Sequence, residues 1–111
     1  MKALLTLLSA LFCALANAQD PWPSRPLRFI VPYPTGGLTD VLARAIADRL
    51  GAALKQPVLV ENKPGAGTLL GAEIVARSAG DGYTLLMATS TTLGISPAIW
   101  GVVKAAGLKV D

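Results

Sequence analysis

The sequence contains no histidine and only one cysteine, Cys13, which lies in an apolar stretch close to the amino terminus. Histidine is the commonest general base and the commonest metal ligand of proteins, and both are missing here. A single cysteine cannot form a disulfide within the chain, and no thiolate chemistry is available beyond residue 13. The acidic residues do not cluster with the spacing of a metal site. We therefore expect no metal and no cofactor.

Charged and aromatic residues are also sparse, at 15% and 5% of the chain. Ten basic and seven acidic residues give a formal charge of +3, and the basic residues are scattered along the sequence. A nucleic-acid surface requires clustered basic residues, so no nucleic-acid partner is expected. A length of 111 residues allows one domain, and its mildly cationic balance suits a small anionic ligand.

What is abundant is apolar sequence at the amino terminus. Lys2 is followed by an apolar run from Ala3 to Ala16, and residues 16–18 then read Ala-Asn-Ala. A positive start, a short apolar run and a small-x-small site are the three parts of a signal peptide. The run is too short for a bilayer span, which favours a cleaved signal over a membrane anchor. We predict a signal peptide over residues 1–18, cleaved after Ala18, and an exported protein.

The central part of the chain begins with an extended lead-in over residues 19–26, QDPWPSRP, in which Trp22 is expected to cover an edge of the core. Residues 27–31, LRFIV, then predict a buried strand. A loop with two prolines and two adjacent glycines leads into a helix that starts near residues 37–39 and continues past Gly51. Its expected core face contains apolar residues at helical spacing: Val41, Leu42, Ala45, Ile46, Leu50 and Leu54.

Polar residues of this helix have their own expected roles. Thr39 could cap the helix, and Asp40 places a negative charge in its first turn, where the helix dipole favours one. Arg44 and Asp48 have the spacing of an ion pair on the solvated face.

The same unit is then repeated. A strand is predicted over 58–60, a turn over 61–68, a helix from 69 to about 77 and a third strand over 83–88. Pro97 suits the first turn of a short helix ending near Trp100, whereas residues 101–111 show no clear helix or strand signal. The β-α-β-α-β order predicts an α/β fold with three parallel strands, half of a doubly wound sheet.

Three turns carry the candidate site: residues 33–40, 62–68 and 89–92. Each follows a predicted strand, at the edge where doubly wound sheets bind ligands. Gly36 and Gly37 allow close backbone approach, so their N–H groups could point at a ligand oxygen, although a tight turn could need glycine in any case. Hydroxyl groups suited to a carboxylate, or alternatively to capping a helix, are supplied by Thr35, Thr39, Ser90 and Thr91.

Two other kinds of site fit less well. Gly65, Gly67 and Gly71 resemble a dinucleotide fingerprint, but they follow the second strand, and no acidic residue ends the third strand. Acidic residues occur in separate turns without a paired histidine or lysine at motif spacing, so catalysis is the weaker class; they are Asp40, Glu61 and Asp81.

From about Trp22 to Trp100 the sequence resembles the amino-terminal part of the tripartite tricarboxylate transporter receptors, also called the Bug family. The resemblance lies in four motifs: P-x-P-x-G-G-x-T-D from residue 32, E-N-x-P-G-A-G from 61, D-G-Y-T-L-L from 81 and T-S-x-T-x-x-I-x-P-A from 89. It implies a two-lobed, type II-like periplasmic binding protein that works as a monomer. Such a receptor captures a small carboxylate and passes it to a permease with one large and one small membrane subunit. It makes and breaks no bond.

The resemblance also implies how the ligand is held, mainly by backbone amides and ordered water in the strand-to-helix loops. Carried onto this chain, the expected binding residues are Tyr33, Pro34, Thr35, Gly36, Gly37, Thr39, Asp40, Gly65, Ala66, Gly67, Thr89, Ser90 and Thr91.

The sequence departs from the family pattern at Thr35, where a proline is usual, and at Thr68, where a glycine is usual. Family members are also much longer, and residues 101–111 differ from the expected continuation. We therefore expect residues 27–100 to form an incomplete first lobe, followed by a divergent tail. A ligand-presenting partner of a membrane sensor, or a non-functional truncated product, remains an alternative.

Overall fold

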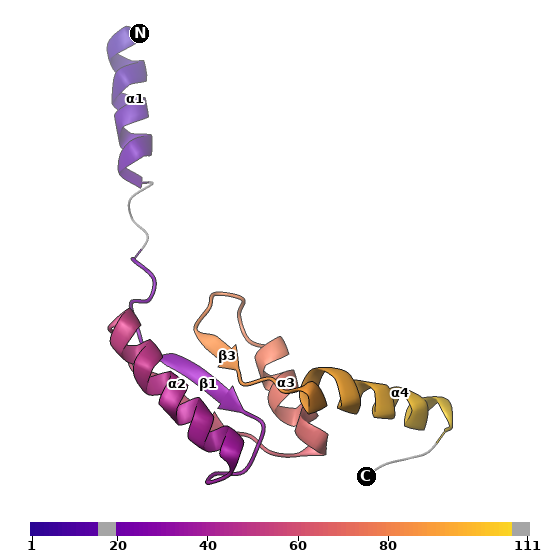
Figure 1. The fold of residues 1–111 in the computed structure, drawn as a ribbon. Helices are drawn as coiled ribbons and strands as arrows, with labels where there is room; N and C mark the ends of the chain where they lie inside the picture. The colour runs from indigo at the N-terminus through magenta and orange to yellow at the C-terminus, as the bar shows by residue number, and fades with distance from the viewer. Residues whose placement is uncertain (16–19, 108–111) are drawn as a thin grey trace.

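The computed structural model describes residues 1–15 and 20–107 (Figure 1). Its first element is the helix α1, Lys2–Leu15, which contains residues 3–15 of the apolar run. The predicted cleavage position after Ala18 lies outside the described residues. None of the helices within those two ranges has the length and apolarity needed to cross a membrane.

A three-stranded parallel sheet forms the centre of the fold, as predicted. The strands are β1 (Leu27–Val31), β2 (Val58–Asn62) and β3 (Thr84–Leu86), in the order β2-β1-β3. β1 is central and is almost wholly buried, which explains its nearly continuous apolar sequence. β2 is two residues longer than predicted and ends at Asn62, whereas β3 is shorter than the predicted 83–88.

Two helices connect the strands and cover opposite faces of the sheet (Figure 1). α2 (Leu38–Leu54) joins β1 to β2, and α3 (Leu69–Ala76) joins β2 to β3. The connection from β1 to β2 runs to one side of β1, and the connection from β2 to β3 runs back across it. Because the two right-handed crossovers run in opposite directions along the sheet, they place α2 and α3 on different faces. Two short turns of helix also occur: η1 (Ala66–Thr68) before α3 and η2 (Thr91–Ile95) after β3.

The predicted core face of α2 is wrong over its first three turns. The face that meets the sheet there consists of small residues, Ala43 and Ala47, which pack against Phe29 and Val31 of β1. Four predicted core residues are exposed instead, whereas Leu50 and Leu54 are half-buried; the exposed four are Val41, Leu42, Ala45 and Ile46. Small side chains allow the helix axis to lie close to the sheet, and this close packing determines which stripe is buried.

α3 also lies close to the sheet, and Gly71 makes this possible. A Cβ atom at Gly71 would lie 2.8 Å from Cβ of Pro32 and 3.2 Å from the carbonyl oxygen of Lys63. Pro32 is itself fully buried at the end of β1. The glycine that resembled part of a dinucleotide fingerprint therefore has a packing role, because it brings α3 against the first loop.

Other expectations for the helices are corrected as follows. α2 begins at Leu38 with Gly37 as its N-cap, so Thr39 lies inside the helix and does not cap it. Arg44 pairs with Asp40 rather than with Asp48. The last helix, α4 (Ser96–Ala105), has Pro97 in its first turn as predicted but continues five residues beyond Trp100, into the segment that showed no helix signal.

The lead-in is docked at the end of the sheet where the strands begin, which we call the amino edge. The backbone N–H of Ser24 donates to the Tyr83 hydroxyl at 2.8 Å. The Arg25 guanidinium lies 3.8 Å from the centre of the Tyr83 ring, and the Trp22 ring meets Tyr83 edge-on. Trp22 remains half exposed, so it covers this edge only in part.

Candidate functional site

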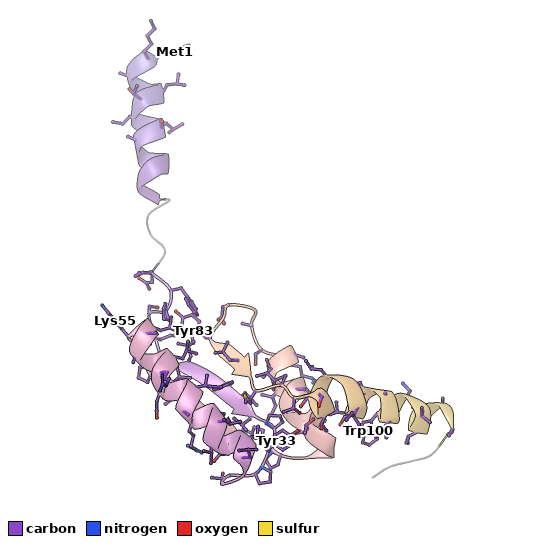
Figure 2. All side chains as sticks on the ribbon, in the orientation of Figure 1. Met1, Tyr33, Lys55, Tyr83 and Trp100 are labelled. Carbon is purple, nitrogen blue, oxygen red and sulfur yellow. The ribbon has the colours of Figure 1, made fainter. Side chains whose placement is uncertain are left out.

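Three loops meet at the opposite end of the sheet, which we call the carboxyl edge because each follows the last residue of a strand. They are the first loop (residues 32–37, after β1), the second loop (63–68, after β2) and the third loop (87–92, after β3). In Figure 2, Tyr33 marks the carboxyl edge and Tyr83 marks the amino edge. The sequence predicted this gathering of turns, and the parallel sheet produces it.

Side chains join the three loops to one another. The hydroxyl groups of Tyr33 and Thr89 share a hydrogen bond of 2.7 Å, which links the first loop to the third. The Ser96 hydroxyl donates to the carbonyl oxygen of Gly67 and thereby links the start of α4 to the second loop. The backbone N–H of Lys63 donates to the carbonyl oxygen of Val31 at 2.8 Å. The relative positions of the loops are therefore fixed by specific contacts.

A buried polar network holds the first loop. Asp40, only 2% exposed, accepts hydrogen bonds at Oδ2 from the Gly36 backbone N–H at 2.9 Å and from Arg44 Nε at 3.1 Å. Its Oδ1 accepts from Asn62 Nδ2 at 2.9 Å. Asn62 Nδ2 also donates to the carbonyl oxygen of Tyr33 at 3.0 Å, and an Arg44 nitrogen donates to Asn62 Oδ1 at 3.1 Å. The network connects both ends of the loop to α2 and β2.

The electrostatics of this network favour an ionised Asp40. Hydrogen bonds from Arg44, from the Gly36 N–H and from Asn62 lower the pKa of the Asp40 carboxyl group to about 2. At neutral pH the carboxylate is therefore ionised and pairs with the Arg44 guanidinium, whose side chain is half exposed. Both Asp40 oxygens accept from the chain itself.

The start of α2 leaves backbone N–H groups available at this edge, since it has no capping side-chain hydrogen bond within the described residues. The first N–H groups of α3 are used by the chain itself, because Leu69 donates to the carbonyl oxygen of Ala66 and Leu70 to that of Gly65. The first N–H groups of a helix have no intrahelical acceptor and carry the positive end of the dipole. Such a terminus is suited to an anion. For α2 these groups begin at Leu38, next to the exposed Gly37.

The second loop has an unusual backbone. Four consecutive residues have positive φ: Gly65 at 132°, Ala66 at 49°, Gly67 at 58° and Thr68 at 77°. A β-branched residue rarely adopts this conformation, so Thr68 is held there by its surroundings. Its side chain is only 6% exposed, and its hydroxyl oxygen has no hydrogen-bond partner among the described residues.

The third loop presents hydroxyl groups near the first. Thr89 contacts Tyr33 and also lies 3.3 Å from the hydroxyl of Thr92, which is buried. Thr91 is half-buried, and Ser90 is exposed at the start of η2. Thr92 thus supports the loop from inside, while Ser90 remains accessible to solvent.

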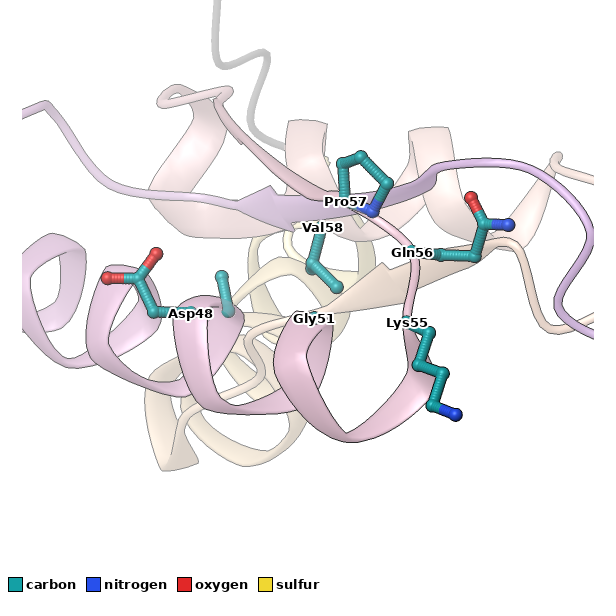
Figure 3. Close-up of a pocket in the computed structure, with 7 residues that line it drawn as sticks. Asp48, Gly51, Lys55, Gln56, Pro57 and Val58 are labelled. Carbon is teal, nitrogen blue, oxygen red and sulfur yellow. The ribbon is translucent and has the colours of Figure 1, made fainter.

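Of two hollows in the surface, one lies at the amino edge and the other borders the second loop. One of about 390 Å³ lies beside the turn from α2 to β2 and is lined by Asp48, Gly51, Lys55, Gln56 and Pro57 among others (Figure 3). That turn is at the amino edge, and the hollow is wide open. A smaller one of about 240 Å³ is lined mainly by apolar residues of α4, with Gly67 and Ser96 at one side.

The structure thus brings the three predicted turns together but gives their residues different surroundings. Gly36 has φ of 92°, as expected for a glycine-dependent turn, yet its N–H is bonded to Asp40. Gly37 has an extended backbone and is exposed. Pro34, Thr35, Gly65, Ala66 and Gly67 are exposed, and Thr39 is half-buried. The assignment of ligand contacts to the thirteen residues stays a prediction.

Sequence reasoning included Asn62 and Thr92 in the candidate turns but did not predict that they hold the loops, and it gave Arg44 and Ser96 no role at the site. One feature of the sequence could have indicated the role of Asn62: it is an amide side chain between two charged residues, at the end of β2. A search of residues 1–15 and 20–107 for three or more histidine, cysteine or acidic side chains able to hold a metal ion finds none.

A parallel α/β sheet with loops and a helix start gathered at its carboxyl edge defines the class of doubly wound ligand-binding domains. Residues 42–105 match the family model described as tripartite tricarboxylate transporter family receptor. The match covers more than half of the chain, and the protein belongs to this family. Solute binding is the family's role.

Individual relatives agree with this assignment. Protein BugT of Bordetella pertussis is 51% identical over 72 residues, which are 65% of this chain and 22% of that protein. MatC from Rhodopseudomonas palustris with bound malate is 43% identical, with a TM-score of 0.57, over 59% of this chain and 22% of that one. Rpa4515 of R. palustris with adipate is 40% identical, with the same TM-score and coverage. The chain therefore spans about a quarter of the length of its relatives.

Proposed function

We propose that this chain contributes the first lobe of an exported receptor that captures a small carboxylate and delivers it to the permease subunits of a tripartite tricarboxylate transporter. The ligand is bound without chemical change. The signal-like residues 1–18, with cleavage after Ala18, support delivery to the periplasm. Two relatives of similar fold hold malate and adipate, which are small dicarboxylates.

The observation that carries the proposal is the uncapped start of α2 beside the exposed Gly37 at the carboxyl edge. Backbone N–H groups at this place can donate to a carboxylate without any basic side chain. Arg44, the basic residue bonded to the network that holds this loop, already donates to Asp40 and Asn62. The proposal therefore assigns the ligand charge to amides and the helix dipole.

A pair of variants at Gly37 tests this directly. Gly37 has φ of −77°, close to the value that proline imposes, so Gly37→Pro removes one N–H group at little cost to the backbone. Gly37→Ala is the matched control, because it retains the N–H and its Cβ meets only the Pro34 carbonyl oxygen at 3.8 Å. We expect Gly37→Pro to weaken malate or adipate binding about tenfold or more, whereas Gly37→Ala binds as the parent chain does.

The measurement is calorimetric or NMR titration with both dicarboxylates, and with 1,6-hexanediol as a neutral counterpart of adipate. We expect binding by residues 1–111 alone to be weak, in the millimolar range, since one lobe buries only part of a ligand. Micromolar affinity would contradict the one-lobe proposal. Equal binding by Gly37→Pro and Gly37→Ala would contradict the amide mechanism.

A further inference from the structure

Asp40 occurs in the first turn of α2, where an exposed carboxylate would repel an anionic ligand. Its burial and its hydrogen bonds remove this conflict, because both carboxylate oxygens face donors of the protein: Gly36 and Arg44 at Oδ2, and Asn62 at Oδ1. The charge is balanced by Arg44, at 3.1 Å. Neither oxygen needs a ligand as a partner.

The same contacts fix the backbone of the first loop at two points. At one end the Gly36 N–H donates to Asp40, and at the other end the Tyr33 carbonyl oxygen accepts from Asn62. Asn62 is itself bonded to Asp40, so a single network holds both ends. Between and beside these points lie Pro34, Thr35 and Gly37, which are exposed.

We propose that Asp40 is a positioning residue, which together with Asn62 and Arg44 holds the first loop. In this position the N–H groups from Gly37 onward face the carboxylate of the ligand, and neither Asp40 nor the Gly36 amide touches the ligand. This inference rests on the proposed function for the identity of the ligand. It changes the expected role of two residues that the family resemblance suggested as ligand contacts.

Hydrogen exchange tests the loop-holding part without any ligand. In the parent chain we expect the Gly36 amide to exchange at least tenfold more slowly than the neighbouring Gly37 amide, for which the described residues provide no acceptor. This comparison requires no variant to fold. Equal exchange at the two glycines would overturn the proposal.

Asp40→Asn is the informative variant, because it keeps the shape of the side chain and removes its charge. Asp48→Asn, on the exposed side of the same helix, is the matched control. We expect Asp40→Asn to raise the exchange rate of Gly36 about tenfold more than those of the β1 amides, with the largest changes at residues 33–39, and Asp48→Asn to leave Gly36 unaffected. An increase at Gly36 no greater than the increase throughout β1 would indicate a role in overall stability only and would overturn the proposal.

Titration with malate tests the ligand-facing part. In the parent chain we expect amide shifts that depend on malate at Gly37, Leu38 and Thr39, while the Gly36 amide and the Asp40 carboxyl carbon stay in place. In Asp40→Asn the dissociation constant should rise about tenfold, measured at a temperature where circular dichroism shows both proteins to be folded. A direct shift of the Asp40 carboxyl carbon that saturates with malate would overturn the proposal. If no carboxylate shifts any amide, the proposed function fails, and the exchange rates still decide whether Asp40 holds the loop.

Discussion

The two edges of the sheet differ in how their polar groups are used. At the carboxyl edge, a network of Arg44 and Asn62 around the buried Asp40 fixes the first loop, and the start of α2 remains uncapped. At the amino edge, Arg25, Asp81 and Tyr83 fasten the lead-in with contacts on the surface. Residues 20–25 thus stabilise the fold from outside, whereas the loops opposite are held from inside. Because the first loop is held by side chains beneath it, its outward-facing amides stay available to bind another molecule.

The largest effect is expected from a change that disturbs the internal support of the carboxyl edge. Gly71→Ala would place a methyl group 2.8 Å from Cβ of Pro32, and the backbone on both sides has little room to move. We expect a loss of about 1–3 kcal/mol in the free energy of unfolding, measured by urea denaturation. Gly101→Ala in α4 is the control, because a Cβ there meets nothing within 4 Å. A Gly71→Ala chain as stable as Gly101→Ala would show that α3 does not pack as described.

Lowering the pH below about 4 should reduce the free energy of unfolding, because protonation removes the contribution of the buried Asp40 carboxylate at the carboxyl edge. The pKa of Asp40 is about 2 in the folded chain against an ordinary 3.8, so its contribution to stability is fully present above pH 3.8. As the pH falls below 3.8, the unfolded chain takes up a proton first, and the contribution is lost by about pH 2. The pKa of Glu61, lowered by its hydrogen bonds with Arg28, changes stability in the same direction.

Asp40→Asn separates the two groups, since Glu61 is the same in both proteins. We expect the stability difference between the parent chain and Asp40→Asn, from urea unfolding, to shrink steadily between pH 4 and pH 2. A difference that stays constant over this range would mean that Asp40 titrates normally and that the network is not formed in solution.

Each edge has a tyrosine whose hydroxyl group forms a hydrogen bond, so the same group can be removed at both edges. Tyr33→Phe removes the bond to Thr89 that joins the first and third loops, and Tyr83→Phe removes the bond to Ser24. We expect Tyr33→Phe to cost about 1 kcal/mol in unfolding free energy and to weaken malate binding. Tyr83→Phe should cost less and leave binding unchanged. The comparison would fail if Tyr83→Phe affected binding as strongly as Tyr33→Phe.

The smallest effect is expected from the surface ion pair of the amino edge. Arg25 and Asp81 are joined at 3.1 Å, but their side chains are 60% and 41% exposed. We expect Asp81→Asn to change the unfolding free energy by less than about 1 kcal/mol, and the change should disappear in 1 M salt. A larger effect that persists in salt would show that the lead-in is held more firmly than its exposure indicates.

The order of strands and helices could be predicted from the sequence because each apolar run is bounded by proline and glycine turns. The face of α2 could not, since apolar residues occur on more than one side of the helix. Its packing depends on how closely Ala43 and Ala47 let it approach Phe29 and Val31. Periodicity records which residues are apolar, but not the distance between a helix and its sheet.

The candidate site, like the fold, could be predicted from the sequence only in part. Glycine-rich turns after parallel strands predicted where the three loops meet. The partners of Arg44 could not be predicted, because spacing along the helix allows both Asp48 and Asp40, and only the position of Asn62 on β2 favours Asp40. Likewise, the bond between Tyr33 and Thr89 joins residues far apart in the sequence. Contacts of this kind become visible only once the sheet is assembled.

The central claim, that backbone amides at the carboxyl edge bind a small carboxylate, is tested most directly by amide NMR spectra of the chain during titration with malate. We predict saturable shifts at residues 37–39 and 89–91 and none at the amino edge, including residues 22–25 and 81–83. Shifts that gather instead around the hollow at Gly51–Val58, or no shifts at any malate concentration, would contradict the account.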